Sequence, residues 1–432
     1  MQEKKPKNKL GLKLLIIGAL ILVLLIPGAM IMSLIRERQI RRDDAVFEVS
    51  EKWGQEQTVS GPVISIPFKT FFKDKKGNWT VYTHYAHFLP DDLSIEAMVN
   101  PEIRYRGIYE VVLYNTSLKL KGNFSSINMK KFSIPAKDIL WQESFLSVGI
   151  THMKGIKESI IVNWNDSELT VNPGIESNDI LASGFSTRIN VKPDNENMEF
   201  SLEIDLNGSG GLHFAPLGNE TNVNIVSNWK NPSFIGEFLP ENREVTDEGF
   251  SANWKVLQLN RNYPQEWIGN KFRIESSTFG VELLLPVDEY QKNMRTVKYA
   301  IMFILLTFLA FFMMETLNKK KIHPFQYLLV GTALIIFYTL LLSISEHLSF
   351  KYAYLIASVA TIALITAYTK SVLKDKKLTS IIALILIILY CFLYVLLQLQ
   401  DYALLLGSIG LFVILAVVMY ISRKIDWYAG SA

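Results

Sequence analysis

The sequence predicts a multi-pass α-helical membrane protein with a large β-rich, sandwich-like extracytoplasmic domain inserted between its first helix and five further helices. The mean hydropathy of the 432 residues is +0.20, which is high for a water-soluble protein. Apolar runs are concentrated at residues 10–35 and in the last third of the chain, whereas the middle contains no apolar run of bilayer length. A chain of this length can hold two or three domains.

Six stretches are long enough to cross a bilayer, because about 20 apolar residues at about 1.5 Å each span about 30 Å of hydrocarbon. The first, residues 10–35, follows a lysine-rich segment and is longer than the core of a signal peptide. No A-x-A-like cleavage site follows it, which favours an uncleaved signal anchor over a cleaved signal peptide. The other five predicted spans form a bundle and cover residues 297–317, 325–344, 352–368, 381–399 and 402–421.

The basic residues predict the orientation, because short cytoplasmic loops are enriched in lysine and arginine. Lysines cluster at residues 4–9, 318–321 and 373–377. This pattern places the N-terminus (1–9), both loops and the C-terminal tail (422–432) in the cytoplasm, and residues 36–296 outside it. Four arginines directly after the first span oppose this orientation. The basic residues, or their absence, in the five other segments beside the spans agree with it. Such clusters beside apolar runs are orientation signals, so the expected partner is the lipid bilayer and not a nucleic acid.

In several stretches of the predicted outer domain, apolar residues recur at about every second position. Apolar and polar residues alternate from Met198 to Leu206, which predicts a strand with one buried and one solvated face. The glycine-rich run 207–211 predicts a reversal before a short strand at 212–215; a phosphate-binding loop is the alternative, but no helix opens after it. Similar patterns predict strands at 58–70, 80–89, 109–124, 139–150, 159–164, 222–228 and 249–259. Strands and turns at this spacing predict a sandwich.

The sequence offers little catalytic or cofactor chemistry. It lacks the G-x-S-x-G, H-E-x-x-H, C-x-x-C and phosphate-loop motifs, so we expect neither an enzyme nor a bound cofactor. His84 and His87 lie at an odd offset and would point to opposite faces of a strand, so no metal is expected there. The single cysteine, Cys391, lies in the fifth predicted span, which excludes disulfides from the outer domain.

Polar residues at the ends of the predicted spans form a first candidate site. Ionisable groups in mid-span are costly and usually functional, but spans four to six contain none in their interiors. Glu315, His323 and Gln326 lie at the cytoplasmic ends of spans two and three, and Glu346 and His347 lie at the outer end of span three. Three interpretations stay open: charges that reach water, a substrate or proton site, and ion pairs that order helix ends.

The segment 228–249 forms a second candidate site. It contains two prolines and several aromatic residues, and neither a helical nor a strand period fits it. Long irregular segments are often binding loops. Trp229, Phe234, Phe238 and Arg243 are residue types that anchor interfaces, which predicts an interaction loop. Folding of this loop back onto the domain core is an equal alternative.

Several long segments carry a family resemblance. They are KYAIMFILLTFLAFFMMETL (298–317), HPFQYLLVG (323–331), LLLSISEH (340–347), SNWKNPSFIGEFLPENREV (227–245), IDWYA (425–429) and, more weakly, GPVISIP (61–67). With these segments the chain resembles the CreD family of bacterial inner membrane proteins over nearly its whole length. The candidate residues at the span ends fall on positions that look like the family pattern.

The resemblance implies six spans in the inner membrane. It also implies a link to cell envelope integrity and stress, including a sensor-kinase network and tolerance of colicins or β-lactams, but it supplies no reaction. We therefore expect a non-enzymatic protein that binds an envelope protein or cell-wall component. The alternative is a transporter or lipid-handling protein that uses Glu315, His323 or the Glu346–His347 pair. The oligomeric state stays open.

Overall fold

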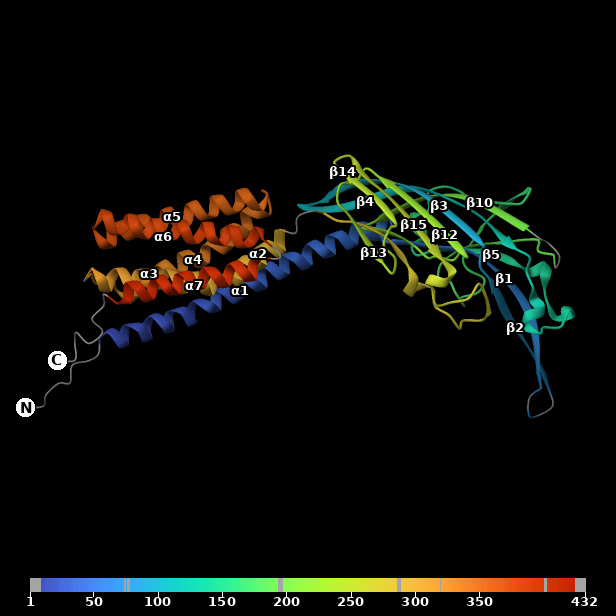
Figure 1. Ribbon diagram of the computed structural model, residues 1–432, viewed down its shortest axis with the longest axis horizontal. Coiled ribbons are helices and arrows are strands. Elements are labelled where there is room, and N and C mark those ends of the chain that lie inside the picture. Colours follow the sequence, from blue (N-terminus) through green and yellow to red (C-terminus); the bar gives the residue numbers. More distant parts are fainter. Residues whose placement is uncertain are drawn as a thin grey trace, which may run out of the picture. The chain divides into compact units, whose positions relative to one another are not determined.

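The computed structural model describes residues 9–73, 75, 78–192, 197–285, 289–318, 320–399 and 402–423 (Figure 1). They form two compact units, one within residues 1–43 and 287–432 and the other within residues 44–286. We call them the helical unit and the β-rich unit. The expected lysine cluster at 4–9, except Lys9, lies outside the described residues, as do Lys319 and the tail from 424, including IDWYA.

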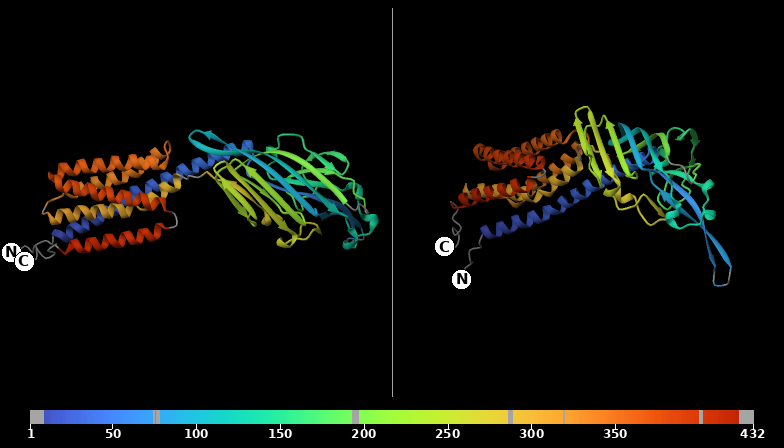
Figure 2. Two further views of the ribbon diagram at one scale, coloured as in Figure 1. Left: turned by 45° about the horizontal axis from the view of Figure 1, so that its top comes forward. Right: turned by 45° about the vertical axis from the view of Figure 1, so that its right-hand side comes forward.

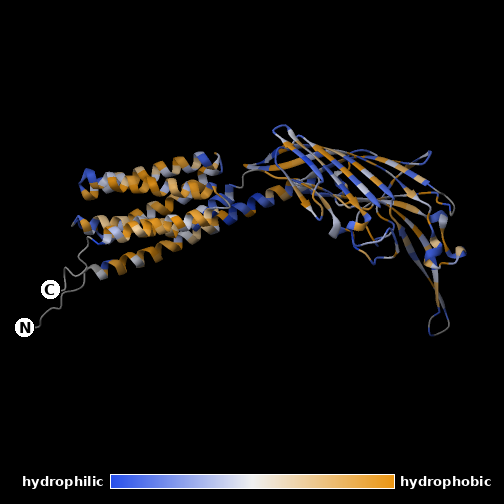
Figure 3. Ribbon diagram, viewed as in Figure 1, coloured by the Kyte–Doolittle hydropathy of each residue, from blue (hydrophilic) through white to orange (hydrophobic). Residues whose placement is uncertain are grey.

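The described residues contain six helices that are long and apolar enough to cross a membrane. One is N-terminal and five are C-terminal, and the β-rich unit lies between them in the chain, which confirms the predicted fold class. Within the helical unit the C-terminal helices lie side by side (Figure 2), and most of their residues are hydrophobic (Figure 3). The six are α1 (Lys9–Trp53), α3 (Ala300–Leu317), α4 (Pro324–Ser345), α5 (Phe350–Leu373), α6 (Lys376–Gln398) and α7 (Ala403–Ser422).

The first helix is longer than the sequence pattern predicts. It does not end near Ile35, because the polar residues that follow also favour a helix. Arg41 pairs with Glu37 at 2.6 Å and Lys52 with Glu48 at 2.8 Å, both at the i,i+4 spacing that stabilises helices. The helix ends before Gly54, which has a φ of +149°. A polar helical segment thus continues directly from the apolar one.

A further helix, α2 (Glu289–Lys298), precedes α3. From the sequence, residues up to 296 were expected in the outer domain. In the structure α2 is part of the helical unit, where it packs against α4 and α6. Its polar composition hid this role, because it is too short and too charged to resemble a membrane span.

The β-rich unit contains two sheets that enclose one core, which confirms the sandwich-like architecture. Among the described residues the first sheet has nine strands in the order β13-β17-β11-β1-β5-β9-β8, with β2 paired to β1 and β16 paired to β2. Its strands are β1 (Gln57–Lys73), β2 (Trp79–Phe88), β5 (Phe145–Ile150), β8 (Asn172–Pro173), β9 (Gly184–Arg188), β11 (Gly211–Phe214), β13 (Pro232–Gly236), β16 (Glu266–Ile268) and β17 (Phe279–Leu283).

The second described sheet has eight strands in the order β14-β15-β12-β3-β4-β10-β6-β7. Apolar side chains from both sheets, such as Ile64 and Ile66 of the first and Ile204 and Trp254 of the second, belong to one buried cluster. The strands of this sheet are β3 (Asp92–Arg106), β4 (Tyr109–Ser125), β6 (Ile161–Trp164), β7 (Ser167–Thr170), β10 (Asn197–Ser209), β12 (Glu220–Ser227), β14 (Asn242–Thr246) and β15 (Gly249–Leu257).

Two local predictions in this unit are wrong. The run 207–211 does not make a reversal: β10 continues to Ser209, and the chain then crosses to β11 in the other sheet. Gly210, at a φ of +73°, makes this crossing possible. In the predicted range 139–150 only residues 145–150 form a strand, β5, and a short 3₁₀ turn, Trp141–Glu143, precedes it.

Three strands of the second sheet were not expected from the sequence; two of them, β7 and β14, are short, and the third is much longer. This third strand is β3, in which buried residues alternate with exposed or half-buried ones over its first half; the buried ones are Leu93, Ile95, Ala97 and Val99. The alternation is the pattern of a strand with one buried face. The strand therefore follows the same rule as the strands that were expected.

Candidate functional site

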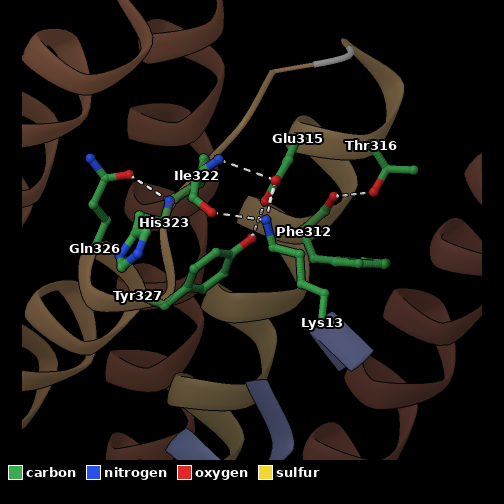
Figure 4. Close-up of polar contacts among 8 residues, drawn as sticks. All are labelled: Lys13, Phe312, Glu315, Thr316, Ile322, His323, Gln326 and Tyr327. Carbon is green, nitrogen blue, oxygen red and sulfur yellow. Dashed lines mark hydrogen bonds and ion pairs between the residues drawn. The ribbon is translucent and has the colours of Figure 1, made fainter. Parts of the chain in front are cut away.

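Four residues meet at one end of the helical unit and form what we call the Lys13 cluster: Lys13 of α1, Glu315 of α3, Ile322 and Tyr327 (Figure 4). The Oε1 atom of Glu315 accepts hydrogen bonds from the Lys13 ammonium and from the backbone N–H of Ile322, the latter at 3.1 Å. The Oε2 atom accepts from the Tyr327 hydroxyl at 3.0 Å. Lys13 also donates to the carbonyl of Ile322 at 2.9 Å. The cluster therefore joins α1 to the turn between α3 and α4.

Burial makes this contact energetically important. Glu315 is only 8% exposed, and charges in such surroundings are costly unless each is paired and hydrogen-bonded. Both carboxylate oxygens of Glu315 have partners, and the Lys13 ammonium has two acceptors. The geometry is that of a satisfied ion pair that fixes three chain segments.

His323 and Gln326 do not form a shared site with Glu315. Together they cap the N-terminus of α4. The Nδ1 atom of His323 accepts from the Phe325 N–H at 3.2 Å, and Gln326 Oε1 accepts from the His323 N–H at 2.9 Å. Pro324 occupies the first helical position, where a missing N–H costs nothing. The HPFQ sequence is thus explained by helix capping.

A second set of contacts lies at the opposite end of α4; we call it the Glu346 cluster, formed by Arg38, Tyr290 and Glu346. Glu346 Oε1 lies 3.7 Å from the Arg38 Nε atom and accepts from the Tyr290 hydroxyl at 3.4 Å. Beside it, Asn293 of α2 donates to the Ser345 hydroxyl at 2.7 Å. His347 follows Glu346, and its backbone N–H donates to the carbonyl of Ile344 at 3.1 Å.

The two clusters are separated by the length of a membrane span. Lys13 and Arg38 are 25 residues apart in α1, which corresponds to about 38 Å along a helix. A bilayer with its headgroup regions measures about 40–45 Å. Each cluster therefore fastens α1 at a different end of the bundle, and the two cannot serve one small-molecule site.

Five members of these clusters were not expected from the sequence: the side chains of Lys13, Arg38, Tyr290 and Tyr327, and the backbone of Ile322. For the Lys13–Glu315 pair, the sequence contained a signal that could have predicted the contact. Lys13 is the only charged residue between Leu10 and Ile35, and Glu315 is the only acidic residue in 297–317. A single charge in an apolar span requires a partner of opposite charge, which points to this pairing.

A buried polar chain lies in the β-rich unit, where the Ser65 hydroxyl is 2.9 Å from His87 Nδ1 and His87 Nε2 is 3.1 Å from Asp179 Oδ2. The order serine, histidine, aspartate along this hydrogen-bonded chain resembles that of a hydrolase triad. However, Ser65 is 3% and His87 1% exposed, so the hydroxyl is closed to a substrate in this structure. Burial lowers the pKa of His87, and Asp179 partly offsets this effect. The chain joins β1 and β2 to the loop that carries Asp179.

The predicted interaction loop, 228–249, contains the two strands β13 and β14, which lie at one edge of each sheet. Trp229, Phe234 and Phe238 are half-buried and pack against the core. The Phe234 ring lies 5.6 Å from the Phe250 ring, and the Trp229 Nε1 atom donates to the carbonyl of Leu284 at 3.2 Å. The exposed Arg243 guanidinium lies 5.7 Å from the centre of the Phe234 ring. Edge strands alternate weakly, which explains why no period was visible.

The most exposed apolar surface among these features is the distal half of the β1–β2 hairpin. Within the part of the chain that the structure describes, residues 69–73 of β1 pair only with residues 79–83 of β2, whereas the proximal parts of both strands have further partners. We call this two-stranded part the β1–β2 ribbon; it projects from the sheet in Figure 1 and in the right-hand view of Figure 2. Its large apolar side chains are exposed, with Trp79 at 65% and Phe72 at 62%; the others are Phe71, Val81 and Tyr82.

Comparison with known proteins gives a family for the whole chain. The sequence model of the family described as "Inner membrane protein CreD" matches residues 9–428. The chain belongs to the CreD family. A curated CreD relative, "Inner membrane protein CreD" of Escherichia coli (strain K12), is 34% identical over 433 residues, which cover 98% of this chain and 95% of the relative. The chain is accordingly an inner membrane protein with several spans.

Solved structures add little to this CreD assignment. The crystal structure of an M1 zinc metallopeptidase from Deinococcus radiodurans matches with a TM-score of 0.19 and 8% identity, over 39% of this chain and 38% of that chain. A mutant of the same peptidase, bound to a Tyr-Ser-Ala substrate, gives a TM-score of 0.18 and 6% identity, over 39% of each chain. At these values the likeness indicates neither fold nor function.

Proposed function

We propose that this CreD family protein supports cell envelope integrity by binding an envelope component through its β-rich unit, while the helical unit anchors it in the inner membrane. The observation that carries this proposal is the β1–β2 ribbon. Water-soluble surfaces rarely expose large contiguous apolar patches, and those that do are commonly interaction sites. Five large apolar side chains on a ribbon of ten residues are such a patch.

The proposal includes an orientation. The N-terminus and the loops at 318–321 and 373–377 face the cytoplasm, and residues 36–296 face the periplasm. The lysines of the α3–α4 and α5–α6 turns support this orientation, because basic residues favour the cytoplasmic side. The C-terminal tail follows α7 back to the cytoplasmic side.

The proposed role is binding and not catalysis or transport. Glu315 and Glu346 support this assignment, since each carboxylate is used in contacts that order helix ends. His323 and Gln326 cap α4, which gives both side chains a structural role. A transporter that uses these residues is the less supported alternative.

We assign a mainly structural role to three residues of the segment 228–249. Trp229, Phe234 and Phe238 fasten the edge strands β13 and β14 to the core, because their rings are half-buried there. Arg243 is exposed and stays available to a partner.

The double substitution Phe72→Ser with Tyr82→Ser is expected to abolish function while the protein is still made. Both side chains are exposed, so their loss removes the apolar surface with little change in the core. The measurement is complementation of a strain that lacks the gene, grown with a detergent or a β-lactam. The double variant should behave like the empty vector at wild-type protein level.

Val226→Ser is the matched control, because Val226 is an exposed apolar residue of the same unit outside the ribbon. It should complement fully. Full complementation by the double variant, at equal protein level, would remove the ribbon from the functional account.

A further inference from the structure

We infer that the partner of the β1–β2 ribbon is an anionic lipid surface, into whose headgroup layer the ribbon places its aromatic side chains. This inference rests on the proposed function, because it names the partner of the same surface. Three features of the ribbon support it: apolar groups on both faces, a positive charge, and a suitable length.

The first feature is the distribution of apolar side chains. Directly paired residues of two antiparallel strands point to the same face, and successive residues point to opposite faces. Phe71 pairs with Val81, and Lys73 with Trp79, so their side chains share one face. Phe72 and Tyr82 lie on the other face. A headgroup layer that the ribbon enters contacts both faces at once, which matches apolar side chains on both faces.

The second feature is charge. The segment 69–84 contains four lysines and one aspartate, a net charge of +3 without its histidine. The Lys73 ammonium lies 5.7 Å from the centre of the Trp79 ring, so a basic and an aromatic group are presented together. Tryptophan and tyrosine favour the membrane interface, and lysines near a membrane surface favour anionic lipids.

The third feature is length. Five paired residues on each strand extend about 16 Å, at about 3.3 Å per residue. The headgroup region on each side of a bilayer is about 5–8 Å thick, from the difference between about 40–45 Å and about 30 Å. The outer part with Phe72 and Trp79 can therefore enter the headgroup region, while Thr83 stays in water.

The test uses the full-length protein with Cys391→Ala and Thr80→Cys, labelled with an environment-sensitive NBD dye and held in phosphatidylcholine nanodiscs. Thr80 lies on the ribbon and is exposed. Vesicles of phosphatidylcholine with 30% phosphatidylglycerol should shift the dye emission to shorter wavelength and co-sediment the protein. Pure phosphatidylcholine vesicles should do neither, and high salt should weaken the binding. Phe72→Ser with Tyr82→Ser should raise the lipid concentration for half-maximal binding at least about tenfold, and Val226→Ser should not change it.

A second arm uses phosphatidylglycerol nanodiscs without vesicles. A dye shift there also supports the inference, and it locates the ribbon at the membrane that holds the protein. The absence of a shift in both arms overturns the lipid inference, as does equal binding to phosphatidylcholine. If the ribbon variant nevertheless fails to complement, the proposed function stands with a protein or cell-wall partner. If lipid binding is lost and complementation is intact, the proposed function fails and the lipid contact stands.

Discussion

Glu315→Gln is expected to lower the free energy of unfolding of the helical unit by about 3 kcal/mol, because it leaves the half-buried Lys13 ammonium without its counter-charge. The same change weakens the hydrogen bonds from Ile322 and Tyr327. The measurement is thermal unfolding of the full-length protein in a mild detergent. Such a loss would release the start of α1 from the α3–α4 turn.

Two further variants distinguish a structural ion pair from a functional carboxylate. Tyr327→Phe removes one hydrogen bond to the same carboxylate and should cost about 1–2 kcal/mol. Lys13→Met combined with Glu315→Leu removes both charges and should recover most of the stability lost in Glu315→Gln. A Glu315→Gln protein that is as stable as the wild type but inactive would contradict the structural role.

Gly331→Leu is also expected to destabilise the helical unit strongly, because α1 packs closely on α4 at this glycine. The buried residues Ile17, Leu24 and Ile31 recur at seven-residue spacing along α1 and form one contact face. A Cβ atom at Gly331 would lie 2.2 Å from the Leu24 Cδ1 atom and 2.9 Å from the Phe308 ring. Leu24 and Phe308 are themselves buried, so their side chains have little room to give way to a whole leucine side chain at position 331. We expect a loss of about 3 kcal/mol or more, measured by the same thermal unfolding.

Gly18→Leu is the matched control in α1, because no atom lies within 4 Å of a Cβ built at Gly18. It should leave the unfolding temperature nearly unchanged. Leu24→Ala should reduce the cost of Gly331→Ala, since it removes the side chain that meets the new methyl group. Equal stability of Gly331→Leu and Gly18→Leu would show that α1 does not pack on α4 as described.

The membrane spans could be predicted from the sequence because their signal is local. An apolar run of bilayer length is rare outside membrane helices, so α3 to α7 were expected close to their observed ranges. The extension of α1 to Trp53 was also encoded locally, in the pairs Glu37–Arg41 and Glu48–Lys52. These residues were assigned to the outer domain because they are polar.

Contacts between distant parts of the chain could not be predicted in the same way. Lys13 and Glu315 are 302 residues apart, and only the packing of α1 beside the α3–α4 turn brings them together. The exposure of the β1–β2 ribbon could not be predicted for a similar reason. Its strands were expected, but the exposure of Phe72 and Tyr82 depends on neighbouring strands that end before the ribbon does. Strand length in the neighbours is not visible in the sequence of the hairpin.

The measurement that tests the central claim most directly asks which side of the inner membrane carries the β-rich unit. In a Cys391→Ala background, Asn163→Cys and Lys374→Cys are each exposed to a small membrane-impermeant maleimide in intact cells. Both positions are accessible on the protein surface. The proposed orientation predicts that Asn163→Cys is labelled in intact cells and that Lys374→Cys is labelled only after the inner membrane is opened. Labelling in the reverse order would place the ribbon in the cytoplasm and contradict its proposed contact with the envelope.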